Sequence, residues 1–153
     1  ERFDAAKPGA LLGKFLPALE GPGKMSSSDD APAIELTDDR DAVREKVMQH
    51  AHSGGRVDAA AHRTHGGDPE VDVAYQYLHS FFEPDDERVA EVARRYRDGA
   101  LLSGELKQLA VERIADFLAT HQERRARLGD LRSELEPYRL REHERERLRP
   151  DVL

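Results

Sequence analysis

Residues 37–137 carry a succession of helix start and stop signals, and this feature constrains the fold more than any other. Acidic and hydroxyl residues stand where helices would begin, and glycines stand where they would end. Between these signals, apolar residues recur at intervals of three and four, which is the spacing of one helix face. We therefore predict a mainly α fold, with a helical bundle over residues 37–137.

The first two predicted helices lie on either side of a double glycine. The first begins within Thr37–Asp41, where N-cap candidates and first-turn acids gather, and it stops at Gly54–Gly55. The second covers Arg56–His65 and is closed by Gly66. The core face of the first helix is expected to consist of Val43, Val47 and Ala51.

Three further helices are expected downstream. One begins at Asp68, since an acid followed by proline is a common helix start. The next follows Pro84 and ends at Gly99, and Ser103 caps the last long helix. The residues expected to face the core are Val71, Ala74, Tyr75, Leu78, Phe82, Val89, Val92, Tyr96, Leu106, Leu109, Ala110, Phe117 and Leu118.

The apolar run Pro8–Leu19 is broken by glycine and proline, and its length favours a strand over a helix. A single strand has nothing to pair with. We therefore expect it to complete a sheet whose other strands lie outside this chain, and we expect the chain to be part of a longer protein.

The stretch Gly21–Asp30 joins that strand to the helices and combines two glycines, one lysine and three successive serines. Backbone N–H groups, hydroxyls and a lysine are suited to a mobile loop that closes over phosphates. The alternative is a solvated linker, because Gly, Ser and Asp also gather in such linkers.

Charge and composition limit the classes of partner. The net charge is −7, so the chain as a whole repels nucleic acid phosphates, and non-specific DNA binding is not expected. Any RNA contact must use local basic spots. The chain has no cysteine, which excludes disulfides and thiolate metal sites, and no apolar run reaches membrane-spanning length.

The residues Lys24–Ser28 resemble the Lys-Met-Ser-Lys-Ser signature of class I aminoacyl-tRNA synthetases. The sequence downstream resembles one branch of that class, the tryptophanyl-tRNA synthetases of archaea and eukaryotes. The matching pieces occur in the family's order and spacing, and they are His50–Arg56, His62–Arg63, Gly66–Gly67, Val71–Leu78, Phe81–Phe82 and Gly99–Lys107.

The resemblance implies a division of the chain into three parts. Residues 1–36 would be the C-terminal remnant of a Rossmann-like α/β catalytic domain, with the signature loop at 24–28. Residues 37–137 would form a helical anticodon-binding domain, and residues 138–153 a polar tail.

The resemblance also implies a function: a cytoplasmic ligase, homodimeric when complete, that activates tryptophan with ATP and transfers it to tRNA(Trp). Mg²⁺ would accompany ATP, and no structural metal is expected. The family's other ATP signature, His-Ile-Gly-His, does not occur here. The chain alone is therefore expected to be inactive.

Carried over to this sequence, the ATP-binding loop comprises Lys24, Met25, Ser26, Ser27 and Ser28. Lys24 is the expected catalytic residue, because its ammonium would stabilise charge that grows on the leaving pyrophosphate. The second lysine of the general signature is replaced here by Ser27. The general signature therefore does not tell which residues of this loop make which contacts to ATP.

The expected tRNA-binding residues lie in the helical domain, where Arg and Lys would contact phosphates and other polar side chains would contact base edges. They are Arg56, Asp58, His62, Arg63 and Lys107. The alternative for each is an ordinary solvated charge or, for His62, a histidine at a helix end.

Several other features have competing interpretations. Four histidines between His50 and His65 with Asp68 could suggest zinc, but helix capping better explains the nearby acids. Arg124–Arg127 could be an RNA patch, although a salt-bridged surface helix is favoured. Core packing is likewise favoured over base stacking for the aromatic residues Tyr75, Tyr77, Phe81 and Phe82.

Two other functions remain open from the sequence. One is a stand-alone helical RNA-binding module without catalysis. The other is a sister ligase specific for tyrosine.

Overall fold

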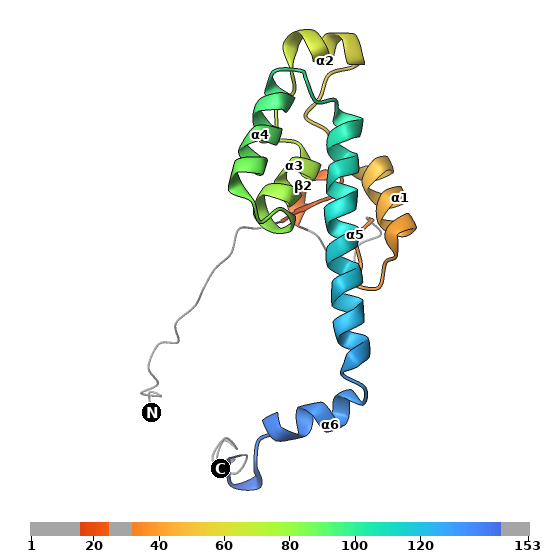
Figure 1. Ribbon diagram of the computed structural model, residues 1–153, viewed down its shortest axis with the longest axis vertical. Coiled ribbons are helices and arrows are strands. Elements are labelled where there is room, and N and C mark those ends of the chain that lie inside the picture. The colour runs from red at the N-terminus through yellow and green to blue at the C-terminus, as the bar shows by residue number, and fades with distance from the viewer. Residues whose placement is uncertain (1–15, 25–31, 145–153) are drawn as a thin grey trace, which may run out of the picture.

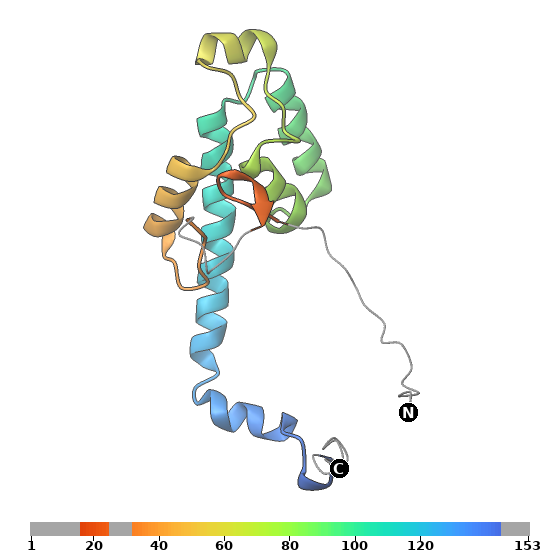
Figure 2. The ribbon, with the colours of Figure 1, turned by 180° about the vertical axis from the view of Figure 1, so that it is seen from behind.

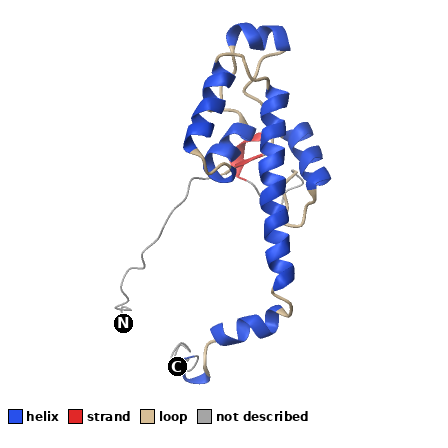
Figure 3. Cartoon of the chain, viewed as in Figure 1, coloured by secondary structure: helices blue, strands red, loops and turns tan. Residues whose placement is uncertain are grey.

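The computed structural model describes residues 16–24 and 32–144 and shows helices around a small β-hairpin (Figures 1 and 3). The hairpin pairs β1 (Pro17–Ala18) with β2 (Gly21–Lys24) in antiparallel register, Ala18 opposite Gly21. The expectation that the apolar run has no partner strand in this chain is therefore wrong for Pro17–Ala18, while residues 8–15 of that run lie outside the described part. The first residues of the predicted loop turn back and pair with the end of the apolar run.

The helical part confirms the mainly α prediction, and its elements follow one another with short connections. The elements are α1 (Arg40–His50), α2 (Ala59–His65), α3 (Val73–Tyr77), the π-helix η1 (Leu78–Phe82), α4 (Asp86–Arg97), α5 (Ser103–Arg127), α6 (Leu131–Leu135) and the 3-10 helix η2 (Glu136–Tyr138).

Helix α5, 25 residues long, is the longest helix in the described part of the chain. In Figures 1 and 2 it runs between α1 on one side and α3 and α4 on the other, with α2 beyond its start and α6 beyond its end. Its buried face includes Leu106, Ala110 and Ile114, and α1 contributes Val43 and Val47 to the same core. Burial of these apolar side chains supplies the main favourable term in folding.

Helix α1 ends at His50, four residues before the predicted stop at Gly54. The chain turns extended at Ala51 (φ −64°, ψ 119°). The reason is tertiary: the His52 N–H donates to the Leu19 carbonyl of the hairpin (2.7 Å), a bond that a continuing helix would not allow. A long-range contact thus overrides a local stop signal.

Helix α3 begins at Val73 with Asp72 as N-cap, and not at Asp68 as the Asp-Pro pair predicts. The Asp68 carboxylate instead accepts a hydrogen bond from the Glu70 N–H (2.9 Å), so that this segment forms a turn. The predicted core residue Val71 is accordingly 47% exposed.

The aromatic residues do not all follow the helical stripe, because α3 continues as a π-helix that rotates the later side chains. Tyr75 and Tyr77 are buried, as core packing predicts, whereas Phe81 is 63% exposed. Phe117, predicted to face the core from α5, is 47% exposed.

The starts of α4 and α5 were predicted within one residue, whereas α2 begins at Ala59, three residues after the predicted start at Arg56, because the Asp58 carboxylate caps it by accepting from the Ala61 N–H. Asp85 caps α4. Helix α5 begins at Ser103 with Leu102 in the N-cap position, where the Glu105 carboxylate accepts from the Leu102 N–H (2.7 Å). Within the described ranges, no helix is both long and apolar enough to cross a membrane.

Candidate functional site

The hairpin that leads to the serine-rich loop is anchored on the helical domain. Leu19, in its turn, is 1% exposed. The Tyr77 hydroxyl donates to the Pro17 carbonyl (2.8 Å), and the His52 N–H donates to the Leu19 carbonyl. Burial raises the pKa of Tyr77 to about 12, so this donor keeps its proton at neutral pH.

The segment that follows the loop is anchored as well. The Lys46 ammonium donates to the Ala33 carbonyl (2.8 Å) and to the Asp38 carboxylate (2.6 Å). From α5, the Gln122 side-chain amide donates to the carbonyls of Leu36 and Asp38, both at 3.0 Å. Both flanks of the loop are therefore fixed to the helices.

Lys24 is the last residue of β2, so its backbone position is set by the anchored hairpin. Its side chain and residues 25–31 lie outside the described part of the chain. The expected ATP-binding roles of Lys24, Met25, Ser26, Ser27 and Ser28 stay predictions.

A hollow of about 270 Å³ lies between the start of α2 and the start of α5. It brings together three of the predicted tRNA-binding residues, Arg56, Asp58 and His62. The other residues that line it are Val57, Ala59, Leu102, Ser103 and Gly104. The partial positive charge of the α5 N-terminus favours an anionic or hydrogen-bond-accepting ligand here.

The Arg56 side chain is positioned by a contact with the backbone at the end of α2. Its Nε–H donates to the carbonyl of Gly66 (2.9 Å). Gly66 has a φ of 64°, a left-handed conformation that favours glycine, and it closes α2. This contact uses one guanidinium nitrogen, and the Arg56 residue as a whole is exposed.

Asp58 and His62, which also line the hollow, make contacts that stabilise the fold around it. Asp58 caps α2, since its carboxylate accepts from the Ala61 N–H (2.8 Å). The His62 ring is 2% exposed and packs on Tyr96, with ring centres 4.9 Å apart. Its Nε2 lies 3.0 Å from the Leu101 carbonyl, and because a carbonyl can only accept, Nε2 carries the proton. His62 therefore forms part of the hollow's floor.

The other two predicted residues are not in this hollow. Arg63 is exposed on α2. The Lys107 ammonium donates to the Met48 carbonyl (3.2 Å) and so ties α5 to α1. Burial lowers the pKa of Lys107, while the Asp72 carboxylate acts in the opposite direction.

A buried polar network below the hollow was missed from the sequence, and Asp72 is its centre. Asp72 is fully buried and accepts hydrogen bonds from the Gly54 N–H (2.9 Å), the Tyr75 N–H (3.2 Å) and the Tyr96 hydroxyl (2.8 Å). Because the Tyr96 proton goes to Asp72, its oxygen accepts from Ser103 (2.9 Å). The signal for it was an acid between two valines in an apolar stretch.

Burial raises the pKa of Tyr96 to about 12, so this phenol also stays neutral and able to donate. The network fixes the double glycine against the start of α5: a Cβ on Gly55 would collide with the Ser103 hydroxyl. The backbone that carries Arg56 is thereby held close to the α5 N-terminus.

The segment 51–56 links the hairpin to the hollow. At one end, the His52 N–H bonds to Leu19, and its carbonyl accepts from the Val73 N–H (3.0 Å). Further along, the Gly54 carbonyl accepts from the Asp68 N–H (2.9 Å). Between these bonds, the Gly54 N–H donates to the Asp72 carboxylate (2.9 Å) and the Gly55 N–H donates to the Ser53 hydroxyl (3.1 Å).

In the part of the chain that the structure describes, no three His, Cys, Asp or Glu side chains gather closely enough to bind a metal ion.

Comparisons with known proteins agree on one family. The family profile described as tRNA synthetases class I (W and Y) matches residues 1–119. The tryptophan–tRNA ligase 2 of Halobacterium salinarum is 56% identical over 151 residues, 99% of this chain and 40% of the relative. The cytoplasmic tryptophan–tRNA ligase of Saccharomyces cerevisiae is 44% identical over 151 residues, 97% of this chain and 35% of the relative.

Solved structures show the same likeness. The tryptophanyl-tRNA synthetase from Giardia lamblia superposes with a TM-score of 0.78 at 37% identity, covering 88% of this chain and 33% of that one. The tryptophanyl-tRNA synthetase from Aeropyrum pernix gives a TM-score of 0.68 at 41% identity, covering 72% of this chain and 30% of that one. The chain thus spans at most two fifths of the length of these relatives.

Proposed function

This chain belongs to the class I tRNA synthetase family of the W and Y type, and on that premise we propose that it is the C-terminal part of a tryptophan–tRNA ligase. The complete ligase would activate tryptophan with ATP, release pyrophosphate and transfer the amino acid to tRNA(Trp). The similarity to tryptophan–tRNA ligases over 99% of the chain carries this proposal, because it includes both the serine-rich loop and the hollow.

In the activation step, the chain's own contribution is the loop that begins at Lys24. The Lys24 ammonium would stabilise the negative charge that develops on the departing pyrophosphate, and it would transfer no proton. The hydroxyls and N–H groups of Ser26, Ser27 and Ser28 would hold phosphate oxygens. Mg²⁺ would arrive with ATP and neutralise part of the phosphate charge.

The anchored flanks support this role. Catalysis by preorganised charge needs the charged group to be held near its working position before the reaction. The hairpin is fixed through Tyr77 and His52, and the segment after the loop through Lys46 and Gln122. The helical domain would therefore set where the loop starts and ends.

The second part of the proposal is that the hollow at Arg56 receives an unpaired base of the tRNA anticodon. The Arg56 guanidinium can donate to a base edge or a phosphate. One oxygen of Asp58 is used as a cap, while the second can accept from a base amino group. The buried ring of His62 would support the floor of the hollow, and the exposed Arg63 would contact a phosphate outside it.

Lys107 has a mixed role in this proposal. Its ammonium is committed to the Met48 carbonyl at the α1–α5 contact. We assign it a long-range electrostatic contribution to tRNA phosphates in place of a contact inside the hollow.

The complete protein would be a homodimer in the cytoplasm, as the class and its cytoplasmic relatives suggest. A tyrosine-specific ligase is the closest alternative, since the matched family includes both specificities. The identity to tryptophan–tRNA ligases in archaea and eukaryotes favours tryptophan. A stand-alone RNA-binding module would not need both flanks of a phosphate loop to be anchored.

Aminoacylation by the longer protein tests the proposal. Purified tRNA(Trp) and tRNA(Tyr) are each offered with tryptophan and with tyrosine. Charging of tRNA(Trp) with tryptophan alone is expected. Charging of tRNA(Tyr) with tyrosine would assign the sister function. RNA binding without charging of either tRNA would assign the non-catalytic module.

A further inference from the structure

An aromatic cluster lies on the surface far from the hollow at Arg56. It consists of Phe81 and Phe82 on η1 and Phe117 on α5, and we call it the phenylalanine patch. Phe81 is 63% and Phe117 47% exposed. Phe82 joins the two, with ring centres 6.0 Å from Phe81 and 5.5 Å from Phe117, the latter edge to face. Large exposed aromatic groups of this kind usually mark a binding surface.

A hollow of about 360 Å³ opens beside the patch. Phe82 and Phe117 form its apolar side, and polar groups from one face of α5 form the other. The polar residues that line it are Arg113, Asp116, Thr120, His121 and Arg124.

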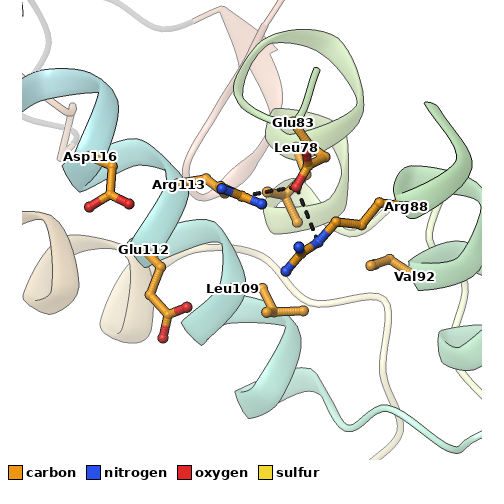
Figure 4. A pocket seen from close by; sticks show the side chains of 8 residues that line it. All are labelled: Leu78, Glu83, Arg88, Val92, Leu109, Glu112, Arg113 and Asp116. Carbon is orange, nitrogen blue, oxygen red and sulfur yellow. Dashed lines mark hydrogen bonds and ion pairs between the residues drawn. The ribbon is translucent and has the colours of Figure 1, made fainter. Parts of the chain in front are cut away.

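The acids close to this hollow are already neutralised. Glu83 lies between two arginines, 2.9 Å from the Arg113 Nε and 3.3 Å from the Arg88 Nε, as Figure 4 shows. Asp116 is paired with Arg40 (2.6 Å).

Further along α5, Glu123 is paired with Arg127 (3.5 Å). In the described part of the chain, Arg124 and His121 have no such partner. The rim of the hollow therefore carries surplus positive charge, although the whole chain carries −7.

We infer that the phenylalanine patch binds an unpaired nucleotide of RNA. The base would stack on the exposed phenyl rings, and the phosphate would contact Arg124. Exposed aromatic rings beside an unpaired arginine form the kind of surface that single-stranded nucleic acid binds, through base stacking and a phosphate contact. A packed protein domain is disfavoured because covering Arg124 would bury a charge without a partner.

The patch and the Arg56 hollow lie at different heights on α5. Ser103 and His121 are about 18 residues apart, or about 27 Å along the helix. One tRNA can touch both places. The inference extends the proposed tRNA binding, but it is tested with an RNA that has no anticodon, so the two can fail separately.

The test is fluorescence anisotropy of a labelled adenine octaribonucleotide, titrated with the 153-residue chain and with the longer protein. Phe117→Ala should weaken octamer binding by roughly 5- to 100-fold, since it removes a stacking surface. Arg124→Ala should weaken binding and reduce the slope of log affinity against log salt by about 0.7, the value for one phosphate on a single strand.

Two matched variants serve as controls. Arg125→Ala removes a neighbouring cation that does not line the hollow, and Leu128→Ala removes a 47% exposed apolar side chain from the end of the same helix. Neither should change the affinity for the octamer. Thermal unfolding of each variant checks that the helices remain folded.

The inference is overturned if the octamer does not bind, or if Phe117→Ala binds it as well as the unchanged chain. It is also overturned if the octamer binds the chain but not the longer protein, because another domain then covers the patch. Octamer binding that depends on Phe117, together with no preference for tRNA(Trp), would support the inference while the proposed function failed.

Discussion

Lys24 is the last residue of β2, so its backbone lies at the end of a hairpin that is hydrogen bonded to the helices. In the complete ligase, Lys24→Ala should lower the rate of tryptophan activation about a hundredfold, or roughly 3 kcal/mol. This is the cost of losing one preorganised group that stabilises the transition state. Tryptophan-dependent pyrophosphate exchange measures it. Near-normal exchange, with tRNA binding intact, would show that Lys24 has no catalytic role.

Arg56 should act on tRNA and not on activation. Arg56→Ala removes the donor of the hollow and should weaken binding of tRNA(Trp) about tenfold to a hundredfold, as expected for one good contact to a base edge. Pyrophosphate exchange should stay unchanged. Arg94, an exposed arginine of α4 paired with Asp98, provides the matched control. Equal losses in Arg56→Ala and Arg94→Ala would mean that only general charge matters.

The two buried tyrosines predict how stability depends on pH. Burial raises the pKa values of Tyr77 and Tyr96 to about 12, against an ordinary value of 10.0. Both phenols are neutral in the folded state at pH 10 to 12, whereas the unfolded chain begins to lose these protons. Their contribution is therefore complete below pH 10 and falls as the pH rises toward 12.

Urea unfolding at a series of pH values measures this effect. The lowered pKa of Lys107 acts in the opposite direction, but at pH values below its ordinary pKa of 10.5, and therefore mostly outside the range in which the tyrosines act. Tyr77→Phe should make the alkaline loss of stability smaller, and Tyr138→Phe, at a residue 84% exposed, should not change it. If stability fell with pH as steeply in Tyr77→Phe as in the unchanged chain, the raised pKa of Tyr77 would not be the cause of the loss.

At the scale of elements, the helices were predictable where their signals are local. The end of α2 at Gly66 and the starts of α4 and α5 follow from acids, hydroxyls and glycines in the sequence, whereas the cap of α2 at Asp58 was not predicted. The end of α1 was not predictable, because the hydrogen bond from His52 to Leu19 joins residues far apart in the chain. The π-helix that exposes Phe81 also gives no local signal.

The candidate site divides in the same way. Arg56, Asp58 and His62 were identified from the sequence, and the structure places all three at one hollow. The network around Asp72 was missed, since it assembles groups from four separate segments. The spacing of residues along the sequence does not indicate which distant residues come into contact in the folded chain.

The Asp72 network predicts a large stability effect. Asp72→Ala removes the N-cap of α3 and the acceptor of three hydrogen bonds, and it leaves the buried Tyr96 hydroxyl without its acceptor. The loss should be about 3 kcal/mol or more. Asp98→Ala, at an exposed carboxylate, is the control. Urea unfolding that shows equal small losses in the two variants would refute the structural role of the network.

At the scale of the whole molecule, one short backbone segment lies between the places proposed for the two activities. The hairpin before the loop and the hollow at Arg56 share the backbone segment 51–56, which is hydrogen bonded at both ends. The described residues of the hairpin, 16–24, are therefore held to the helices by hydrogen bonds as well as by the chain itself. The boundaries between residues 1–36, residues 37–137 and the tail at 138–153 stay predictions.

Amino-acid-dependent exchange of pyrophosphate into ATP tests the central claim most directly. It is measured on the longer protein and on this 153-residue chain, with tryptophan and with tyrosine. We expect exchange by the longer protein with tryptophan only and none by the chain alone, which lacks the His-Ile-Gly-His signature. Exchange that requires tyrosine, or exchange by the chain alone, would contradict the account.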